Sequence, residues 1–157
     1  MFSVKLDPIE HHRGEYMLST DPARLDREMI YDFLTNCYWA KGISRQLVER
    51  SIEHSLCFGI YDSKGAQVAF ARVISDFATI AYLGDVFVLE SYRGRGLSKW
   101  MMQCITQHPA LQGLRRWILL TRDAHGLYSQ FGFTPLQKPD RYMELHTPGV
   151  YETRKTL

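Results

Sequence analysis

Cysteine is scarce in this chain, and long apolar runs are absent. The three cysteines, Cys37, Cys57 and Cys104, stand far apart among 157 residues. An odd number without a CxxC pair predicts no disulfide framework and favours a reducing, cytoplasmic setting with all three thiols buried as small apolar groups. No stretch approaches the roughly 20 apolar residues of a membrane span. Charges interrupt the first ten residues, where a secretory signal needs an apolar core.

What is present is an ordinary globular composition. Hydrophobic residues make up 45% and charged residues 23% of the chain, and the length fits one domain with its own core. We therefore expect a single domain over residues 1–157 that ends in a short tail, 146–157. The net charge of +2 argues against a dedicated nucleic-acid binder, which usually carries a large basic excess.

The distribution of charge is uneven. Residues 1–90 carry a net charge of −4, residues 123–157 are neutral, and residues 91–122 carry six basic groups and no acid. An acid-free stretch inside a nearly neutral protein predicts a site for a small anion, because the rest of the surface offers no general attraction for polyanions.

The hydrophobic pattern predicts a mixed α/β order, β-α-α-β-β-β-α-β-α-β-β. Helical spacing covers residues 26–37, a segment that Ser44 caps, a segment that ends at Pro109, and residues 125–131. Strand patterns cover residues 15–20, 56–62, 66–74, 79–89, 117–121, 133–137 and 141–146.

The most informative stretch is RGRGLS, residues 93–98, between a strand and a helix. The first amides of a helix lack internal partners and lie at its partly positive end, and glycines let a phosphate approach them. This loop therefore predicts a diphosphate site. The P-loop pattern GxxxxGK[ST] is absent, and Lys99 stands where the dinucleotide pattern GxGxxG needs its third glycine.

The loop matches [QR]-x-x-G-x-[GA], with Arg93 first, Gly96 fourth and the small Ser98 in the last position. It resembles the pyrophosphate signature of the GNAT superfamily of acetyl-CoA-dependent N-acyltransferases. The preceding YLGDVFVL resembles the family's fourth strand, which splays from its neighbour, and AHGLYSQFGF (124–133) resembles A-x-x-[LF]-Y-x-x-x-G-F. The resemblance implies an α/β fold with a twisted mixed sheet of six to seven strands flanked by about four helices.

The resemblance also implies acetyl-CoA as co-substrate and no metal. The pantetheine arm would pair with the strand edge like an added strand. The residues expected to hold acetyl-CoA are Phe87, Val88, Arg93, Gly94, Arg95, Gly96, Leu97, Ser98 and Lys99. The family often has Asn three residues before its alanine, and Thr121 stands there.

The implied reaction is acetyl transfer to a primary amine of a small molecule or a protein. Tyr128 occupies the position of a general acid near the thioester sulfur. Asp85, the lone acid of its strand, is the candidate base or amine anchor. In the alternative interpretation, Asp85 has a structural role only and binds neighbouring backbone groups or an arginine. Asp123 is the second choice for the base. Tyr38 and Trp39 would line the acceptor pocket or cap the core.

Other interpretations remain. A non-catalytic CoA-sensing module would bind acetyl-CoA without turnover, although the retention of Asp85 and Tyr128 favours an enzyme. A nucleic-acid binder would use the basic stretch, but residues 1–90 are acidic overall. We expect no nucleic-acid or membrane partner, and the resemblance allows a homodimer. His125 could reach the site, but we expect it behind the site or in an exposed turn. We assign no role to Arg115, Arg116 and Arg122.

Overall fold

A six-stranded sheet forms the centre of the protein, and its strands lie across it in chain order. The computed structural model describes residues 4–153. Neighbouring strands run antiparallel from β1 to β5, whereas β5 and β6 run parallel. The sheet is therefore mixed, as predicted. Its strands are β1 (Glu10–Arg13), β2 (Tyr16–Ser19), β3 (Leu56–Tyr61), β4 (Gln67–Ser75), β5 (Ile80–Val88) and β6 (Arg116–Leu119).

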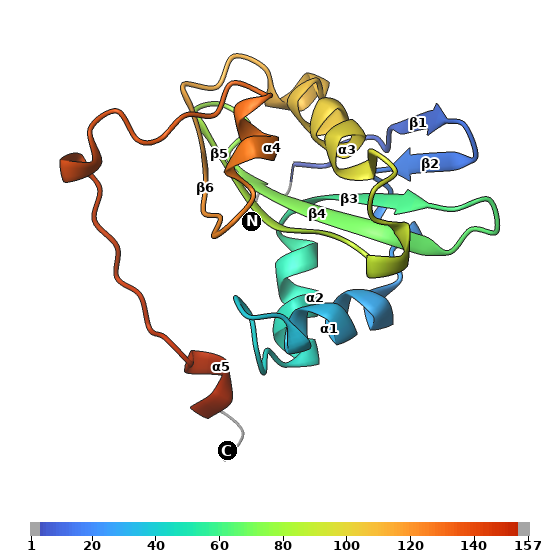
Figure 1. Ribbon diagram of the computed structural model, residues 1–157, viewed down its shortest axis with the longest axis horizontal. Coiled ribbons are helices and arrows are strands. Elements are labelled where there is room, and N and C mark those ends of the chain that lie inside the picture. The colour runs from blue at the N-terminus through green and yellow to red at the C-terminus, as the bar shows by residue number, and fades with distance from the viewer. Residues whose placement is uncertain (1–3, 154–157) are drawn as a thin grey trace.

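Helices cover both faces of this sheet (Figure 1). The first pair, α1 and α2, lies on one face, and α3 and α4 lie on the other, while a fifth helix, α5, ends the described chain. The α/β fold with six strands is confirmed, with five α-helices where about four were expected. Their bounds are α1 (Arg27–Asn36), α2 (Arg45–Glu53), α3 (Leu97–Thr106), α4 (His125–Ser129) and α5 (Val150–Thr153).

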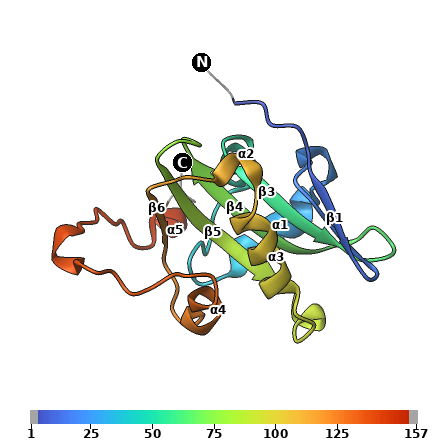
Figure 2. The ribbon, with the colours of Figure 1, turned by 90° about the horizontal axis from the view of Figure 1, so that it is seen from above.

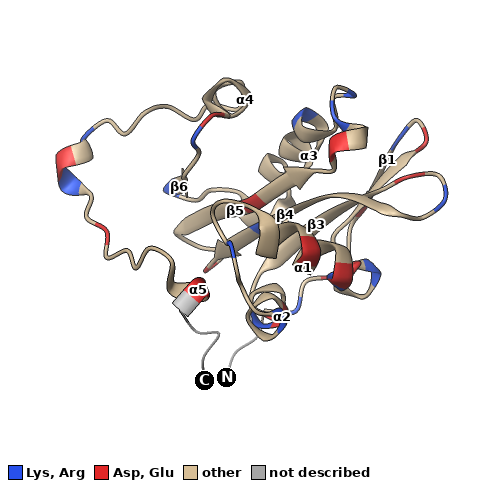
Figure 3. Ribbon diagram, turned by 60° about the horizontal axis from the view of Figure 1, so that its bottom comes forward, with Lys and Arg blue, Asp and Glu red and all other residues tan. Residues whose placement is uncertain are grey.

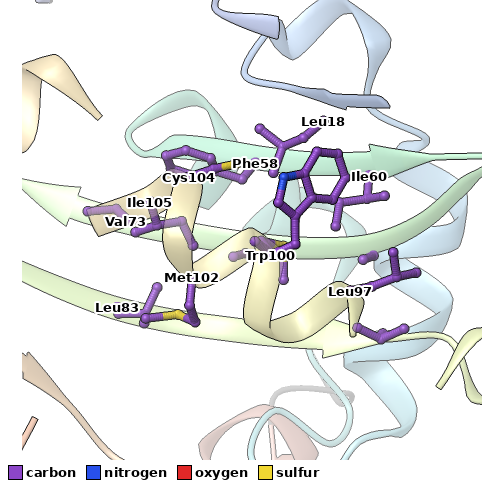
Figure 4. Close-up of a cluster of buried hydrophobic side chains, with 14 of the residues drawn as sticks. Leu18, Phe58, Ile60, Val73, Leu83, Leu97, Trp100, Met102, Cys104 and Ile105 are labelled. Atoms are coloured by element: carbon purple, nitrogen blue, oxygen red, sulfur yellow. The ribbon is translucent and has the colours of Figure 1, made fainter. Parts of the chain in front are cut away.

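Two apolar cores result, one on each face of the sheet. Alternate side chains of β4 point in opposite directions, so Ala71 and Val73 join the core under α3 while Phe70 joins the core under α1 and α2. Figure 4 shows the first core, where Trp100 and Met102 of α3 pack toward the strands. This arrangement fixes α3, and with it the loop that precedes the helix.

Local sequence signals set the helix ends. Ser44 caps α2 through the Leu47 amide, as predicted. The Asp26 side chain, which the sequence pattern places in the helix, instead caps α1 by accepting a hydrogen bond from the Met29 amide. Pro109 opens a 3₁₀ turn soon after α3 ends. None of the helices in residues 4–153 combines the length and apolar character that a transmembrane span requires.

The sequence missed β1, whose four residues are all exposed and carry no apolar pattern. The two strands predicted at 133–137 and 141–146 are wrong, because residues 134–149 form an arm that contains a 3₁₀ helix at Pro139–Arg141 and pairs with no strand of the described chain. A strand forms only where its backbone groups find a neighbour, and the arm runs away from the sheet (Figure 2). The expected tail contains α5. Cys57 and Cys104 are buried, whereas Cys37 is only half-buried.

Candidate functional site

The site begins where β5 separates from β6. Their parallel pairing ends at Leu83 opposite Leu119, and β5 continues through Gly84 to Val88 with β4 as its only partner in the described chain. The pairing of β4 with β5 shifts between Phe70 and Arg72, which makes a β-bulge. The predicted splay is therefore present, and the splayed part of β5 has an open edge.

Asp85 lies on this bulge in an unusual backbone conformation. Its φ of +52° lies in the left-handed region, which non-glycine residues seldom adopt. The carboxylate accepts a hydrogen bond from the Trp39 indole N–H at 2.9 Å and another from Nε of Arg72 at 2.8 Å. Because the side chain is only 12% exposed, both contacts hold it in one place. Asp85 thus has the arginine partner that one interpretation expected.

Arg72 is a site residue that the sequence did not reveal. Its guanidinium also donates to Oγ of Ser55 at 3.1 Å, and that hydroxyl donates to the Ser51 carbonyl at 2.6 Å. Arg72 is the one charged residue of β4, and its side chain is 17% exposed. A lone basic residue in such a strand is the signal that could have marked it, because a buried charge needs a partner.

Tyr128 lies on α4 and is buried, with its ring against Phe133. Burial raises the pKa of this phenol to about 12, and the nearby Tyr38 hydroxyl adds to the increase. The phenol therefore keeps its proton throughout the neutral and mildly alkaline range. A protonated hydroxyl at this position is a proton donor.

Tyr38 and Trp39 lie in the loop between α1 and α2 and are 55% and 40% exposed. Their rings meet edge to face at 5.1 Å. Through its indole, Trp39 binds Asp85, and Tyr38 is close enough to raise the pKa of Tyr128, so the loop lies beside both predicted catalytic side chains. The Arg122 guanidinium lies 4.0 Å from the centre of the Tyr38 ring, which gives this arginine a contact that the sequence did not predict.

The second part of the site is the loop that enters α3. Gly94 and Gly96 have φ values of +78° and +74°, a conformation that favours glycine. Within residues 4–153, the amides of 94–99 meet no protein acceptor, and no side chain caps α3. These free amides at a helix N-terminus fit an anion.

Side chains reinforce this loop unequally. Arg93 Nε donates to the Val88 carbonyl at 3.1 Å, and Arg95 donates to the Tyr16 hydroxyl at 2.8 Å. Leu97 is 3% exposed, so only its backbone can face a ligand. Arg13, which sequence reasoning missed, reaches across from the β1–β2 hairpin and donates to the Gly96 carbonyl at 3.2 Å. In Figure 3 the loop that precedes α3 is partly blue, the colour of Lys and Arg.

The remaining candidates occupy the margins. Phe87 is buried and stacks on Phe33 with ring centres 3.7 Å apart. Thr121 accepts a hydrogen bond from the Ala124 amide before α4. Asp123 is 73% exposed and lies 3.7 Å from Arg122, and His125 is exposed. No group of three or more His, Cys, Asp or Glu residues in the described part of the chain is arranged to hold a metal ion.

Comparison with known proteins places these features in a family. The model of the acetyltransferase (GNAT) domain matches residues 53–135. A protein of Gibberella zeae, whose name assigns it to the acetyltransferases without a stated substrate, is 33% identical over 75% of this chain and 78% of its own length.

Solved structures agree. A protein from Xanthomonas campestris, described as belonging to the GNAT family, is 54% identical and superposes with a TM-score of 0.86 over 89% of this chain and 99% of that one. A predicted acetyltransferase from Clostridium acetobutylicum, solved with acetyl-CoA, shares the fold at 14% identity and a TM-score of 0.61, over 83% of this chain and 94% of its own. The chain therefore belongs to the GNAT family of acetyltransferases.

Proposed function

We propose that this protein transfers an acetyl group from acetyl-CoA to a primary amine of a small molecule or a protein. The observation that carries the proposal is that Asp85 of β5 is held by Trp39 of the loop between α1 and α2, while the protonated Tyr128 of α4 lies near Tyr38 of the same loop, beside the open edge of β5. Acetyl-CoA supplies an activated acyl group, and the chain supplies binding, orientation and proton transfer.

The residues at the splay fit acetyl-CoA. Free amides of residues 94–99, with Arg93, Arg95 and Lys99 beside them, suit a diphosphate. The open edge of β5 at Phe87 and Val88 offers backbone groups to the amides of a pantetheine arm, in the manner of an added strand. A backbone N–H on this edge near Val88 suits the thioester oxygen, where negative charge develops.

The acceptor amine would lie among Asp85, Trp39, Tyr38 and Tyr128. The amine nitrogen attacks the thioester carbon, so that a C–N bond forms as the C–S bond breaks. Asp85 accepts the proton that the nitrogen loses, directly or through one water, and Tyr128 donates its proton to the leaving sulfur. Arg72 and Trp39 are positioning residues in this scheme, because they hold the Asp85 carboxylate.

The experiment is a thiol-release assay with acetyl-CoA and a panel of amines, accompanied by a direct binding measurement. Amine-dependent release that falls in the Asp85→Asn variant supports the proposal. Tight acetyl-CoA binding without thiol release for any amine, and without detectable acetylation of any protein, would instead indicate a CoA-sensing module. Absence of acetyl-CoA binding by a folded protein would refute both functions.

A further inference from the structure

The sheet face that α1 and α2 cover continues beyond these two helices. Backbone pairing places Ile74 of β4 opposite Tyr82 of β5, and Tyr82 opposite Ile118 of β6. Because alternate residues of a strand share a face, this row lies on the same face as Phe70 and Arg72 of β4. Phe70 packs under α1 and α2, whereas the three residues of the row belong to neither apolar core of the described chain. The two helices therefore leave this part of the face open.

The open part of the face is apolar and exposed. Ile74 is 44% exposed, and Ile80, two residues before Tyr82, is 38% exposed. Leu120, two residues after Ile118, is 71% exposed and follows the last paired residue of β6. Tyr82 and Ile118 themselves are half-buried. These five residues form an apolar strip, and a run of exposed apolar side chains marks a binding surface.

The apolar strip reaches the candidate base. A Cβ added to Gly84 would lie 3.1 Å from Cε1 of Tyr82, so the Tyr82 ring leans over Gly84, the residue before Asp85. Arg72 lies on this same face and binds the Asp85 carboxylate, which therefore points to the side of the strip. A molecule whose amine reaches Asp85 thus meets the strip with the rest of its body.

Aromatic rings border Asp85 on the side away from the strip. Trp39 binds the carboxylate through its indole, and the exposed Tyr38 ring meets the Trp39 ring edge to face. The Arg122 guanidinium, two residues after Leu120, lies over the Tyr38 ring. The loop after β6 and the loop between α1 and α2 therefore approach each other beside Asp85, with apolar surface on both.

The charge of Asp85 is already balanced by the protein. Arg72 pairs with the carboxylate at 2.8 Å, and both side chains are mostly buried. Burial raises the pKa of Tyr82, Asp85 raises it further and Arg72 opposes the increase, so these two opposite charges act together on the strip. On the loop after β6, the exposed Asp123 lies 3.7 Å from Arg122. A second ammonium group on the acceptor would leave water for a strip that carries no carboxylate, which is unfavourable.

We propose that the acceptor is a small primary monoamine whose apolar body, alkyl or aryl, lies on the apolar strip while its nitrogen lies at Asp85. This inference rests on the proposed function and narrows its acceptor. Diamines, polyamines and peptide lysines fit the strip less well, because each brings charged or polar groups that find no partner on it.

The first test compares two amines of nearly equal size, hexylamine and 1,5-diaminopentane, which differ by a methyl or an ammonium group at the far end. We expect kcat/KM to be at least about 10-fold higher for hexylamine, and 2-phenylethylamine to be accepted as well. A preference for the diamine, or for a lysine-containing peptide, would overturn the inference while acetyl transfer stands. Failure of every amine with a protein that binds acetyl-CoA would refute the proposed function and the inference with it.

The second test places a charge on the apolar strip. Leu120→Asp and Ile118→Asp should each lower kcat/KM for hexylamine by at least about 10-fold and shift the preference toward 1,5-diaminopentane, because the new carboxylate can meet the second ammonium group. The highly exposed Leu120 contributes little to the core, so Leu120→Asp keeps the test informative if Ile118→Asp fails to fold.

Val4→Asp is the matched control for these variants, since Val4 is 58% exposed and lies outside the apolar strip. Its amine preference should equal that of the wild-type protein. An unchanged preference in folded Leu120→Asp would overturn the inference. Sedimentation velocity on the same variants shows whether a second copy covers the strip instead: lost self-association with an unchanged amine preference would assign the strip to contact between copies.

Discussion

The Trp39 indole N–H donates a hydrogen bond to Oδ1 of Asp85 at 2.9 Å, which ties the loop between α1 and α2 to the bulge on β5. The opposite oxygen of the same carboxylate accepts from Arg72. The Asp85 backbone has a left-handed conformation, and its carboxylate is held from two sides. The carboxylate therefore keeps its position where β5 separates from β6. The loop that carries Tyr38 and Trp39, which would line the acceptor pocket, and the candidate base Asp85 are therefore one structural unit.

Removing the indole donor should harm use of the amine. We expect Trp39→Phe to lower kcat/KM for the acceptor by about 10- to 100-fold, because a hydrogen bond to a charged group contributes about 1.5–3 kcal/mol. Affinity for acetyl-CoA should stay unchanged. Steady-state kinetics and a direct binding measurement test this, with Trp117→Phe as the matched indole control. An equal loss in both variants would assign Trp39 a packing role only.

The Arg72–Asp85 pair should contribute strongly to stability. Asp85→Asn leaves the mostly buried guanidinium without its counter-charge, at a cost of about 3 kcal/mol in the free energy of unfolding. The double variant Arg72→Gln/Asp85→Asn should recover part of that loss, since no unpaired charge remains. Urea unfolding of both single variants and the double variant measures the coupling. Additive losses would show that the two side chains act independently.

Tyr128→Phe should lower kcat by about 10²- to 10⁴-fold, the usual contribution of a general acid. The buried phenol has its pKa raised to about 12, so the wild-type rate should show no alkaline decline from this group below about pH 11. Stopped-flow thiol release across pH checks both points, and Tyr31→Phe controls for removal of a tyrosine hydroxyl elsewhere. An unchanged rate in Tyr128→Phe would remove Tyr128 from the mechanism.

How far the sequence predicts this site depends on whether the signal is local. The loop at 93–99, the helix cap at Ser44 and the strand over 79–89 follow from spacing within a few residues. The contact of Arg72 with Asp85 depends on the pairing of β4 with β5, and the contact of Arg13 with Gly96 joins segments 83 residues apart in the chain. Spacing along the chain cannot show such pairing, so these arginines escaped prediction.

The arm illustrates the opposite limit. Alternation in residues 141–146 predicts a strand that the described chain does not form, because strand formation also needs a free neighbouring edge within reach. The segment meets β6 through a side chain only, because the Arg116 guanidinium lies 5.7 Å from the centre of the Tyr142 ring. Local pattern thus indicates a possible strand, whereas the pairing that would complete a strand depends on the assembled fold.

Gly96→Ala should weaken acetyl-CoA binding. The substitution strains a residue at φ +74° by about 1–2 kcal/mol and adds a methyl group to the loop whose amides would meet the diphosphate. Gly113→Ala is the matched control, because its φ is +73° and an added Cβ meets nothing within 4 Å. Both variants should lose similar stability, and only Gly96→Ala should raise the Kd for acetyl-CoA. Equal affinities would place the diphosphate elsewhere.

Stability should fall as the solution becomes alkaline. Burial raises the pKa of the Cys57 thiol to about 12 and that of Cys104 to about 11, against an ordinary value of 9.0. Above pH 9 the unfolded chain loses these protons while the folded chain keeps them, so the free energy of unfolding decreases up to the folded pKa values and is unaffected below pH 9. Each thiol contributes a slope of up to about 1.4 kcal/mol per pH unit in that window. Urea unfolding from pH 7 to 10.5 should show the decline, and Cys57→Ala should make it shallower by one such slope. An identical pH dependence in the variant would show that the Cys57 thiol titrates alike in both states.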